Sequence, residues 1–431
     1  MEEISTLLIS YLREFIMKQE VIEKYRRGCK DFTRKRKLPF WRLAGLILHG
    51  WKNSAQNRVN RFFKSLGLLD EVATATAFCN ARQKILPTLF KAMNEETVNF
   101  FYTNYEHKGL VNRWKGYLVY AVDGSCVNLP DTEETREKYS IQTNQYDGQG
   151  CVQGLASILY DITNEVVVNA ELEKKQSEKS FIFGSHSLYQ REDVISLYDR
   201  AYADYAVMAY HTKKGKHFVI RSPLSNTFKV VEEFVKSADR DKIVTLQVTS
   251  KQKKFVAEHN LPEQIQVRLT KVELENGEIE VLITSFLDQD TYKVEDFKWV
   301  YNQRWGVETH LDRLKNKLEV ERFSSEKAVG IEQDFNGIIF LSTLESVLSK
   351  EDEQQIAQEN KEKREKEGIY EYKINKSVSY SALADCIVDL LLNLDKSPSE
   401  IVHELRIKFE RKKRTPSQKL WFYKYLKRVW A

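Results

Sequence analysis

Residues 116–125 read GYLVYAVDGS, an apolar run that ends in Asp123 and is followed by Gly124. Two further runs rich in Val, Ile, Leu and Tyr come next, VQGLASILYDI at 152–162 and NEVVVNAELEK at 164–174. Short apolar runs separated by turn residues are typical of β-strands. The three runs therefore predict three successive strands at the start of a sheet.

The residues that follow predict helices between further strands. A helix-compatible stretch at 177–193 leads into the run VISLYDRAY at 194–202, which contains Asp199. The sequence DYAVMAYHTKKG at 204–215 predicts a helix, and KHFVIR at 216–221 predicts another strand. The order strand–strand–strand–helix–strand–helix–strand predicts an α/β fold in which helices cover a mixed sheet.

The segments on both sides of this block have different patterns. Apolar residues recur at helical spacing in residues 1–105, which predicts helices. Residues 223–290 contain three more apolar runs and predict an inserted β subdomain. Helices are expected again at 294–318 and 329–349, followed by a highly charged, solvated helix or linker.

Composition excludes several classes of protein. The 431 residues suffice for two to four domains, and the hydrophobic share of 42% suffices for their cores. The five cysteines are an odd number without a CxxC pair, so we expect reduced thiols rather than disulfides or a zinc site. No run approaches the ~20 apolar residues of a membrane span, and the acidic N-terminus is unlike a signal peptide. We therefore expect a cytoplasmic protein.

Basic residues gather near both ends of the chain, although the net charge is only +5. Residues 24–42 carry nine Lys or Arg against one Asp, and residues 401–431 carry ten against two Glu. A helix–turn–helix near 40–66 would expose five polar side chains to DNA: Asn57, Arg58, Asn60, Arg61 and Lys64. A solvated face of a helical bundle explains this helix equally well. The basic C-terminus suits DNA binding, dimerisation or packing on the body.

Two aspartates stand where strand structure alone does not require them. Asp123 and Asp199 each end an apolar run, and a charge there costs free energy unless it is paired or binds a cation. Two such neighbouring charges repel each other, and a divalent cation between them relieves the repulsion. Each aspartate alone also suits a turn or a helix cap, and Asp161 is an equally placed alternative.

A helical segment near residue 308 supplies a third carboxylate. At about 100° per residue, Tyr301, Arg304, Glu308 and Lys315 fall within about 60° of one another on a helical wheel. That stripe packs poorly in a core but suits an active site, with Glu308 for metal, the two cations for phosphates and the aromatic ring against DNA. A surface helix with i,i+4 ion pairs is the alternative, and Asp312 competes with Glu308 for the role.

The segment YNQRWGVETHLDRLK at 301–315 resembles the Y-x2-R-x3-E-x6-K signature of DDE transposases of bacterial insertion sequences (the IS-four family). The positions that match are Tyr301, Arg304, Glu308 and Lys315. AVDGS resembles the first aspartate motif of this family and YDRAYADY resembles the second, with Ala201 replacing the usual glycine. The resemblance extends from about residue 77 to about residue 345.

This resemblance implies an RNase H-like catalytic core, a mixed five-stranded sheet with helices, interrupted by a β-rich insertion. It places the first aspartate on the first strand, the second on the fourth and the glutamate on a later helix. It implies that Asp123, Asp199 and Glu308 bind two Mg²⁺ ions, for which Mn²⁺ can substitute, with Asp123 as the bridging ligand. The DNA contacts that we expect are Tyr301, Arg304, Lys315, Arg200, Trp299 and Trp305, the tryptophans by base stacking or, alternatively, in the core.

The function implied is cleavage at the ends of a mobile element and strand transfer into target DNA. The partners implied are double-stranded DNA and a second copy of the chain in the DNA complex, in the cytoplasm with the nucleoid and without a membrane. Alternatives are a catalytically silent DNA-binding derivative and an RNase H-like nuclease without strand transfer. The regions expected are an N-terminal DNA-binding region (1–105), a catalytic core (106–222 and 291–349), a β-rich insertion (223–290) and a linker with a basic helical C-terminal region (350–431).

Overall fold

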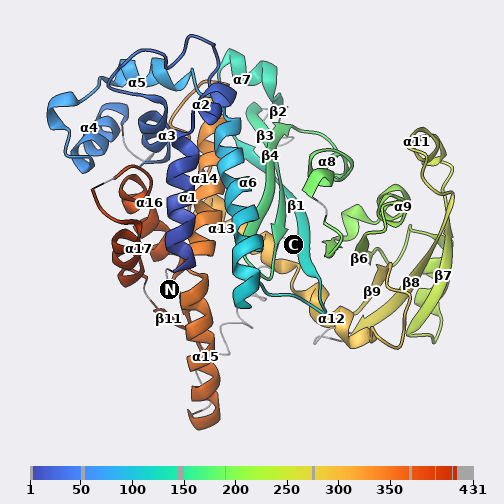
Figure 1. Ribbon diagram of the computed structural model, residues 1–431. Helices are drawn as coiled ribbons and strands as arrows, with labels where there is room; N and C mark the ends of the chain where they lie inside the picture. The colour runs from blue at the N-terminus through green and yellow to red at the C-terminus, as the bar shows by residue number, and fades with distance from the viewer. Residues whose placement is uncertain are drawn as a thin grey trace. The chain divides into compact units, whose positions relative to one another are not determined.

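The computed structural model forms two compact units (Figure 1). The helical unit comprises Met1–Val111 and Arg322–Ala431, and the sheet unit comprises Asn112–Glu321. The structure describes residues 3–49, 54–143, 150–189, 191–273, 277–367, 371–393, 395–409 and 411–414. Within these residues, no helix combines the length and the apolar character needed to cross a membrane.

One mixed sheet of nine described strands organises the sheet unit, in the order β2-β3-β1-β5-β6-β9-β8-β7 with β4 beside β3. The strands are β1 (Leu118–Asn128), β2 (Ile141–Thr143), β3 (Gly150–Asp161), β4 (Val166–Lys174), β5 (Val194–Tyr198), β6 (His217–Ser222), β7 (Asp241–Gln247), β8 (Gln264–Glu273) and β9 (Ile279–Thr284). β1 is antiparallel to β3 and parallel to β5, which is parallel to β6. All five residues of β5 are buried, as expected for a parallel strand covered on both faces.

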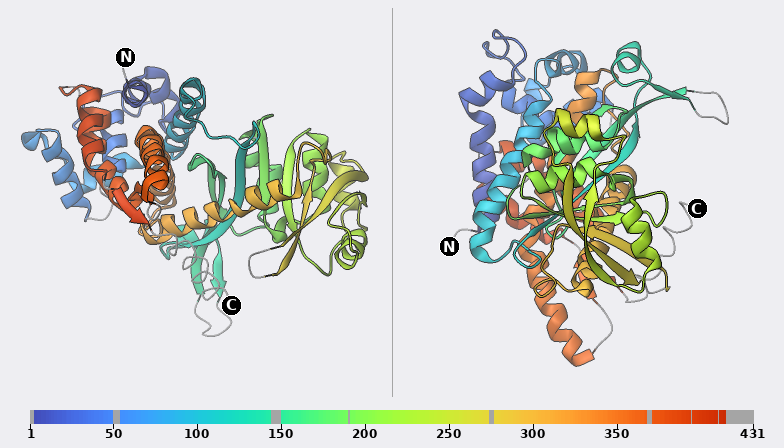
Figure 2. Two further views of the ribbon diagram at one scale, coloured as in Figure 1. Left: turned by 90° about the horizontal axis from the view of Figure 1, so that it is seen from below. Right: turned by 90° about the vertical axis from the view of Figure 1, so that its right-hand side faces the viewer.

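The helices of this unit are α7 (Glu133–Lys138), α8 (Lys179–Phe183), α9 (Tyr205–Lys213), α10 (Lys229–Lys236), α11 (Lys253–Glu258), α12 (Val294–Asn302) and α13 (Trp305–Asn316). With α8 between β4 and β5, and α9 between β5 and β6, the observed element order matches the order expected from the sequence. α12 and α13 follow one another beside the sheet, α12 against β8 and α13 against β1 (Figure 2).

The segment 223–290 differs from the separate β subdomain that its sequence suggested. Its three strands are present, but β9 pairs antiparallel with β6, so β9, β8 and β7 extend the main sheet. The same segment also contains α10 and α11. Apolar alternation predicts that a segment forms a strand but not which edge of a sheet it joins. The pairing of β9 with β6 was therefore not predicted from the sequence.

The helical unit is formed by two segments that are far apart in the sequence. Its helices are α1 (Ile4–Met17), α2 (Gln19–Tyr25), α3 (Phe40–Leu48), α4 (Ala55–Ser65), α5 (Ala75–Arg82), α6 (Thr88–Phe100), α14 (Ala328–Leu348), α15 (Lys350–Glu367), α16 (Lys376–Leu392) and α17 (Pro398–Ile407). A short pair of strands, β10 (Glu371–Ile374) and β11 (Arg411–Arg414), completes it. α14 packs against α3, α6 and α16 and is buried on nearly all sides, so it belongs to this unit rather than to the catalytic core expected at 291–349.

The predicted helix–turn–helix corresponds to α3 and α4, but one of its five side chains is not available to DNA. Arg58 is 1% exposed, and its guanidinium donates hydrogen bonds to the carbonyls of Leu46, Ile47 and His49. The prediction that Arg58 is exposed was therefore wrong, because its guanidinium binds the backbone carbonyls at the C-terminal end of α3. The other four, Asn57, Asn60, Arg61 and Lys64, are exposed. The basic residues at 415–431 lie outside the described residues.

Candidate active site

Asp123 and Asp199 meet at one end of the parallel strand pair β1–β5. β5 pairs with Leu118–Ala121 of β1, and Asp199 is the residue directly after β5. β1 itself continues to Asn128, with Asp123 opposite Ile158 of β3. The expectation that Asp123 ends its strand was therefore wrong, since only the pairing with β5 ends before it. The two carboxylates nevertheless belong to neighbouring strands at the same sheet end.

Asp199 also caps the turn that follows it. Its carboxylate accepts a hydrogen bond of 2.8 Å from the backbone N–H of Ala201, at the start of the 3₁₀ turn Arg200–Tyr202. A cap of this kind fixes the direction of a short side chain. Asp199 is half-buried, so a cap and a site residue are compatible roles here.

Glu308 lies in the first turn of α13, but the helix that carries the signature is not continuous. Tyr301 belongs to α12, and the backbone tightens before α13 through i→i+3 hydrogen bonds such as Arg304 N to the Tyr301 carbonyl (3.0 Å). The prediction of one uninterrupted helix at 294–318 was wrong in this respect. Three of the four signature residues still lie together. The Arg304 guanidinium donates to Glu308 at 2.5 Å and lies 5.8 Å from the centre of the Tyr301 ring.

The charges of the three carboxylates act on one another. The pKa of Asp123 is raised to about 7 by burial first and then by the negative charges of Glu308 and Asp199, against the opposing effects of Arg304 and of the hydrogen bond from Gly124. For Arg304, burial lowers the pKa, but Tyr301, Glu308 and Asp123 outweigh that effect and the net shift is upward. Arg304 is thus the cation that compensates a partly buried group of acids.

The carboxylates suit a divalent metal by chemistry and charge. They are hard oxygen donors of the kind that Mg²⁺ and Mn²⁺ prefer. An ion would relieve the repulsion that raises the pKa of Asp123. Within the described residues, no three His, Cys, Asp or Glu side chains form a ready cluster around a metal position. The fit of a divalent metal to this site therefore rests on the carboxylate oxygens as ligands and on their negative charge, which Arg304 alone does not balance.

The two competing acids have other roles in the structure. Asp161 is fully buried and accepts hydrogen bonds from Thr163 and from the backbone and side chain of Asn164, which close the β3–β4 turn. Asp312 is exposed on α13 and accepts from Asn316. The acids that raise the pKa of Asp123 are Glu308 and Asp199, which favours Glu308 over Asp312 as the third carboxylate.

The six residues expected to contact DNA divide by exposure. Tyr301 and Arg304 are both 4% exposed, and the Tyr301 hydroxyl has no hydrogen-bond partner in the described part of the chain. Lys315 donates to the Cys126 carbonyl at 2.6 Å and so ties α13 to β1. Lys315 is half-exposed, as is Trp305, whose ring lies 5.3 Å from the Arg304 guanidinium; Arg200 and Trp299 (52% exposed) are exposed.

A comparison with known protein families identifies the domain that contains these residues. The model of the family described as "Transposase DDE domain" matches residues 114–344, more than half of the chain. The chain belongs to this DDE transposase family. No curated protein matches the chain. A solved structure that is similar is the piggyBac transposase synaptic complex with hairpin DNA, at 9% identity and a TM-score of 0.44 over 92% of this chain and 85% of that one.

Two residues beside the site of this DDE domain were not selected from the sequence. Glu178, which precedes α8, accepts a hydrogen bond of 2.7 Å from the Tyr202 hydroxyl. Its carboxyl also packs over Gly124, next to Asp123. Tyr202 was quoted as part of the second motif, but Glu178 belongs to no motif. The small residue after Asp123 was the one signal that another group approaches the strand there.

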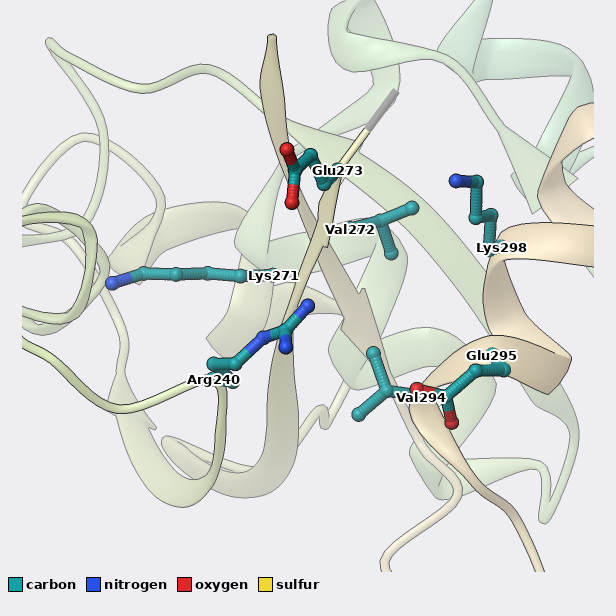
Figure 3. Close-up of a pocket in the computed structure, with 7 residues that line it drawn as sticks. All are labelled: Arg240, Lys271, Val272, Glu273, Val294, Glu295 and Lys298. Atoms are coloured by element: carbon teal, nitrogen blue, oxygen red, sulfur yellow. The ribbon is translucent and has the colours of Figure 1, made fainter. Parts of the chain in front are cut away.

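A pocket of about 230 Å³ lies elsewhere in the DDE domain (Figure 3). It is lined by Arg240, Lys271, Val272, Glu273, Val294, Glu295 and Lys298. None of the residues expected at the active site is among them. Lys271 donates to the Ser237 carbonyl and points away from the pocket, whose remaining cations face two carboxylates. The pocket therefore offers no concentrated charge for an anion.

Proposed function

We propose that this DDE transposase is encoded by a bacterial insertion sequence, cuts DNA at the ends of that element and joins the ends to target DNA. The observation that carries the proposal is that the negative charges of Glu308 and Asp199, from distant parts of the chain, act on the buried Asp123, while Arg304 pairs with Glu308 beside them. A DNA-binding derivative without catalysis has no need of such a group.

The strand arrangement supports an RNase H-like core. Leaving out the three-residue β2, the first five strands along the chain stand in the order β4-β3-β1-β5-β6, with β4, β3 and β1 antiparallel and β1, β5 and β6 parallel. Asp123 lies on the first of these strands and Asp199 follows the fourth. The strands β9, β8 and β7 then form the insertion that separates Asp199 from Glu308.

Asp123, Asp199 and Glu308 are the proposed ligands of two Mg²⁺ or Mn²⁺ ions, with Asp123 bridging. When bound, the ions supply positive charge for the attacking and leaving oxygens of an in-line displacement at phosphorus. The proposed role of Arg304 is to hold Glu308 in the first turn of α13 and to keep positive charge beside the scissile phosphate. Lys315 keeps α13 against β1, so that the glutamate and the first aspartate stay together.

The DNA partner is proposed to contact the exposed residues around this site. Arg200 follows Asp199 directly and has a free side chain for a backbone phosphate. The exposed ring of Trp299 and the half-exposed ring of Trp305 offer surfaces for base stacking. A homodimer in the DNA complex, with the element ends held together, and a location with the nucleoid complete the proposal.

Cleavage of the element's own ends by purified protein tests the proposal. The ends are read from short inverted repeats that flank the gene. We expect Mg²⁺-dependent nicking at these ends and joining of the new 3′ ends to a target plasmid. Asp123→Ala and Glu308→Ala should each lose cleavage, whereas Asp312→Ala on the same helix should retain it. Cleavage without joining would identify a nuclease, and equal activity of Glu308→Ala and Asp312→Ala would refute the site.

A further inference from the structure

Tyr202 and Glu178 connect the segment that carries Asp199 to the strand that carries Asp123. Tyr202 ends the 3₁₀ turn that Asp199 caps, and its ring is 1% exposed. Its hydroxyl donates to Glu178 Oε2 at 2.7 Å. No other hydrogen bond to this carboxylate is found within the described residues. The pair therefore fixes the Asp199 turn to the start of α8.

On its other side, the Glu178 carboxyl packs against Gly124 of β1. A Cβ at this position would lie 2.7 Å from the Glu178 Cδ and 2.9 Å from Oε1. A side chain at this position would force the Glu178 carboxyl to move away, so glycine is what lets the carboxyl pack this closely against the strand. Gly124 directly follows Asp123 and donates its N–H to the Asp123 carboxylate at 2.9 Å. Glu178 therefore touches the backbone that orients the first aspartate.

The neighbouring contacts support a fixed geometry. Lys179, the next residue after Glu178, forms an ion pair of 2.9 Å with Asp204, which caps the start of α9. Two successive residues of the α8 start thus contact the segment 202–204. Burial raises the pKa of Tyr202, and the charges of Glu178, Asp123 and Asp199 raise it further, so the hydroxyl keeps its proton and remains a donor.

We propose that Tyr202 and Glu178 are a positioning pair that sets the separation of Asp123 and Asp199, and hence the affinity of the site for divalent cations. This inference rests on the proposed function, because it assumes that the two aspartates bind metal. In this role Glu178 acts as a hydrogen-bond acceptor wedged over Gly124. A direct metal ligand would instead depend on its negative charge.

Manganese binding separates these roles without relying on catalysis. Binding of Mn²⁺ to the full-length protein is measured by electron paramagnetic resonance of the free ion, alongside the thermal unfolding midpoint. Tyr202→Phe keeps the ring and removes the donor. Loss of a residue that orients metal ligands typically costs about 10–100-fold in metal affinity, and we expect Tyr202→Phe and Glu178→Ala to fall in that range. Glu178→Gln, whose amide oxygen still accepts from Tyr202, should restore most of the affinity.

Tyr198→Phe is the matched control. Tyr198 is also fully buried, and its hydroxyl is hydrogen-bonded to His211 at 2.9 Å rather than to Glu178. This variant should lose stability comparable to that lost by Tyr202→Phe while binding Mn²⁺ like the wild type. If Tyr202→Phe does not fold, the comparison of Glu178→Gln with Glu178→Ala decides the question alone.

The outcomes distinguish this inference from the function on which it rests. If the wild type binds Mn²⁺ and cleaves DNA but Tyr202→Phe and Glu178→Ala bind Mn²⁺ equally well, the positioning pair is refuted and the function stands. A Glu178→Gln variant as weak as Glu178→Ala, beside a normal Tyr202→Phe, would make Glu178 a charged ligand and overturn the positioning role. If the wild type neither binds Mn²⁺ nor cleaves, the proposed function itself fails.

Discussion

Arg82 and Arg58 of the helical unit and Arg304 of the sheet unit are all buried, but their guanidinium groups are hydrogen-bonded to different extents. In the helical unit, Arg82 donates to Gln333, Ser324, the Gly330 carbonyl and Asp334, and its ion pair with Asp334 is 2% exposed on both sides. Its neighbour Arg58 is likewise surrounded by acceptors, and burial lowers the pKa of Arg58 to about 10. These arginines complete the packing of helices.

Arg304 of the sheet unit is buried to a similar degree but is less completely bonded. Its guanidinium pairs with Glu308 and lies near the rings of Tyr301 and Trp305, while its Nε has no hydrogen-bond partner within the described residues. Beside it, Asp123 has a raised pKa. An unsatisfied buried donor next to repelling acids costs stability, and such costs concentrate at functional sites. Arg304 therefore differs from Arg58 and Arg82 in its bonding, as the proposed role at an active site would require.

The largest expected effect of this difference is on the stability of the helical unit. Arg82→Met leaves Asp334 buried without its ion-pair partner, and removing one partner of a buried pair costs about 3–5 kcal/mol in the free energy of unfolding. Arg42→Met is the control, because its pair with the half-exposed Glu71 contributes at most about 1 kcal/mol. Urea unfolding followed by circular dichroism measures both. Equal losses of unfolding free energy in Arg82→Met and Arg42→Met would contradict the expectation that the buried ion pair contributes more than the exposed one.

The second effect is on catalysis in the sheet unit. Arg304→Lys keeps the positive charge but loses the planar guanidinium that holds Glu308. Loss of one well-placed donor at a reacting centre costs about 10²–10³-fold in rate, and we expect such a fall in end cleavage with little change in unfolding free energy. Arg313→Lys on the same helix should cleave normally. A large loss of stability with unchanged cleavage would place Arg304 with Arg82 as a structural residue.

The features of this protein that follow from local sequence patterns could be predicted from the sequence. Apolar runs predicted the strands β1, β3, β4, β5 and β6, because burial on both faces requires continuous apolar segments. The signature spacing selected Glu308 and Arg304, because only a short helical segment is needed to bring them together. Arg58 was expected on an exposed helix face, for DNA or for solvent, because the sequence alone does not show whether a guanidinium meets solvent or backbone carbonyls.

Other features depend on contacts between distant residues. Asp161 and Asp123 end similar apolar runs, and only the turn formed by Asn164 shows that Asp161 is structural. Glu178 lies 54 positions from Gly124 in a segment without a motif, so its approach to Asp123 follows from the tertiary fold alone. The break between α12 and α13 has no proline or glycine at its start to announce it.

A smaller effect concerns the pH dependence of stability without metal. The folded protein raises the pKa of Asp123 from 3.8 to about 7, so folding favours its neutral form. That contribution is complete below pH 3.8 and is lost as the pH rises through about 7. Thermal midpoints in EDTA should therefore show Asp123→Asn close to wild type near pH 4 and increasingly more stable up to pH 8, by about 2–4 °C per kcal/mol of destabilisation removed.

Magnesium provides the check on this pH effect. At pH 8 it should raise the midpoint of the wild type and leave that of Asp123→Asn almost unchanged, because an ion at the site replaces the repulsion with attraction. A constant difference between the two proteins from pH 5 to pH 8, with no response to magnesium, would show that the Asp123 carboxyl is not repelled in the folded protein.

The smallest effect is expected at an exposed arginine. Arg200→Ala removes one cation with no hydrogen bond in the described structure, so stability should not change. If Arg200 contacts a phosphate, the slope of log K against log salt concentration should fall by about 0.9 in magnitude for end DNA. Fluorescence anisotropy over a range of salt concentrations measures this slope. An unchanged slope would exclude Arg200 from the DNA contacts.

The central claim, that three distant carboxylates share bound metal, is tested most directly by iron-directed cleavage of the protein backbone. Fe²⁺ with ascorbate and peroxide produces radicals at the metal position, and fragments are located by mass spectrometry. We predict cuts near Asp123, Asp199 and Glu308 in the wild type, suppressed by excess Mg²⁺ and absent from Asp123→Asn. Cuts confined to other segments, or an identical pattern in Asp123→Asn, would contradict a metal site formed by these residues.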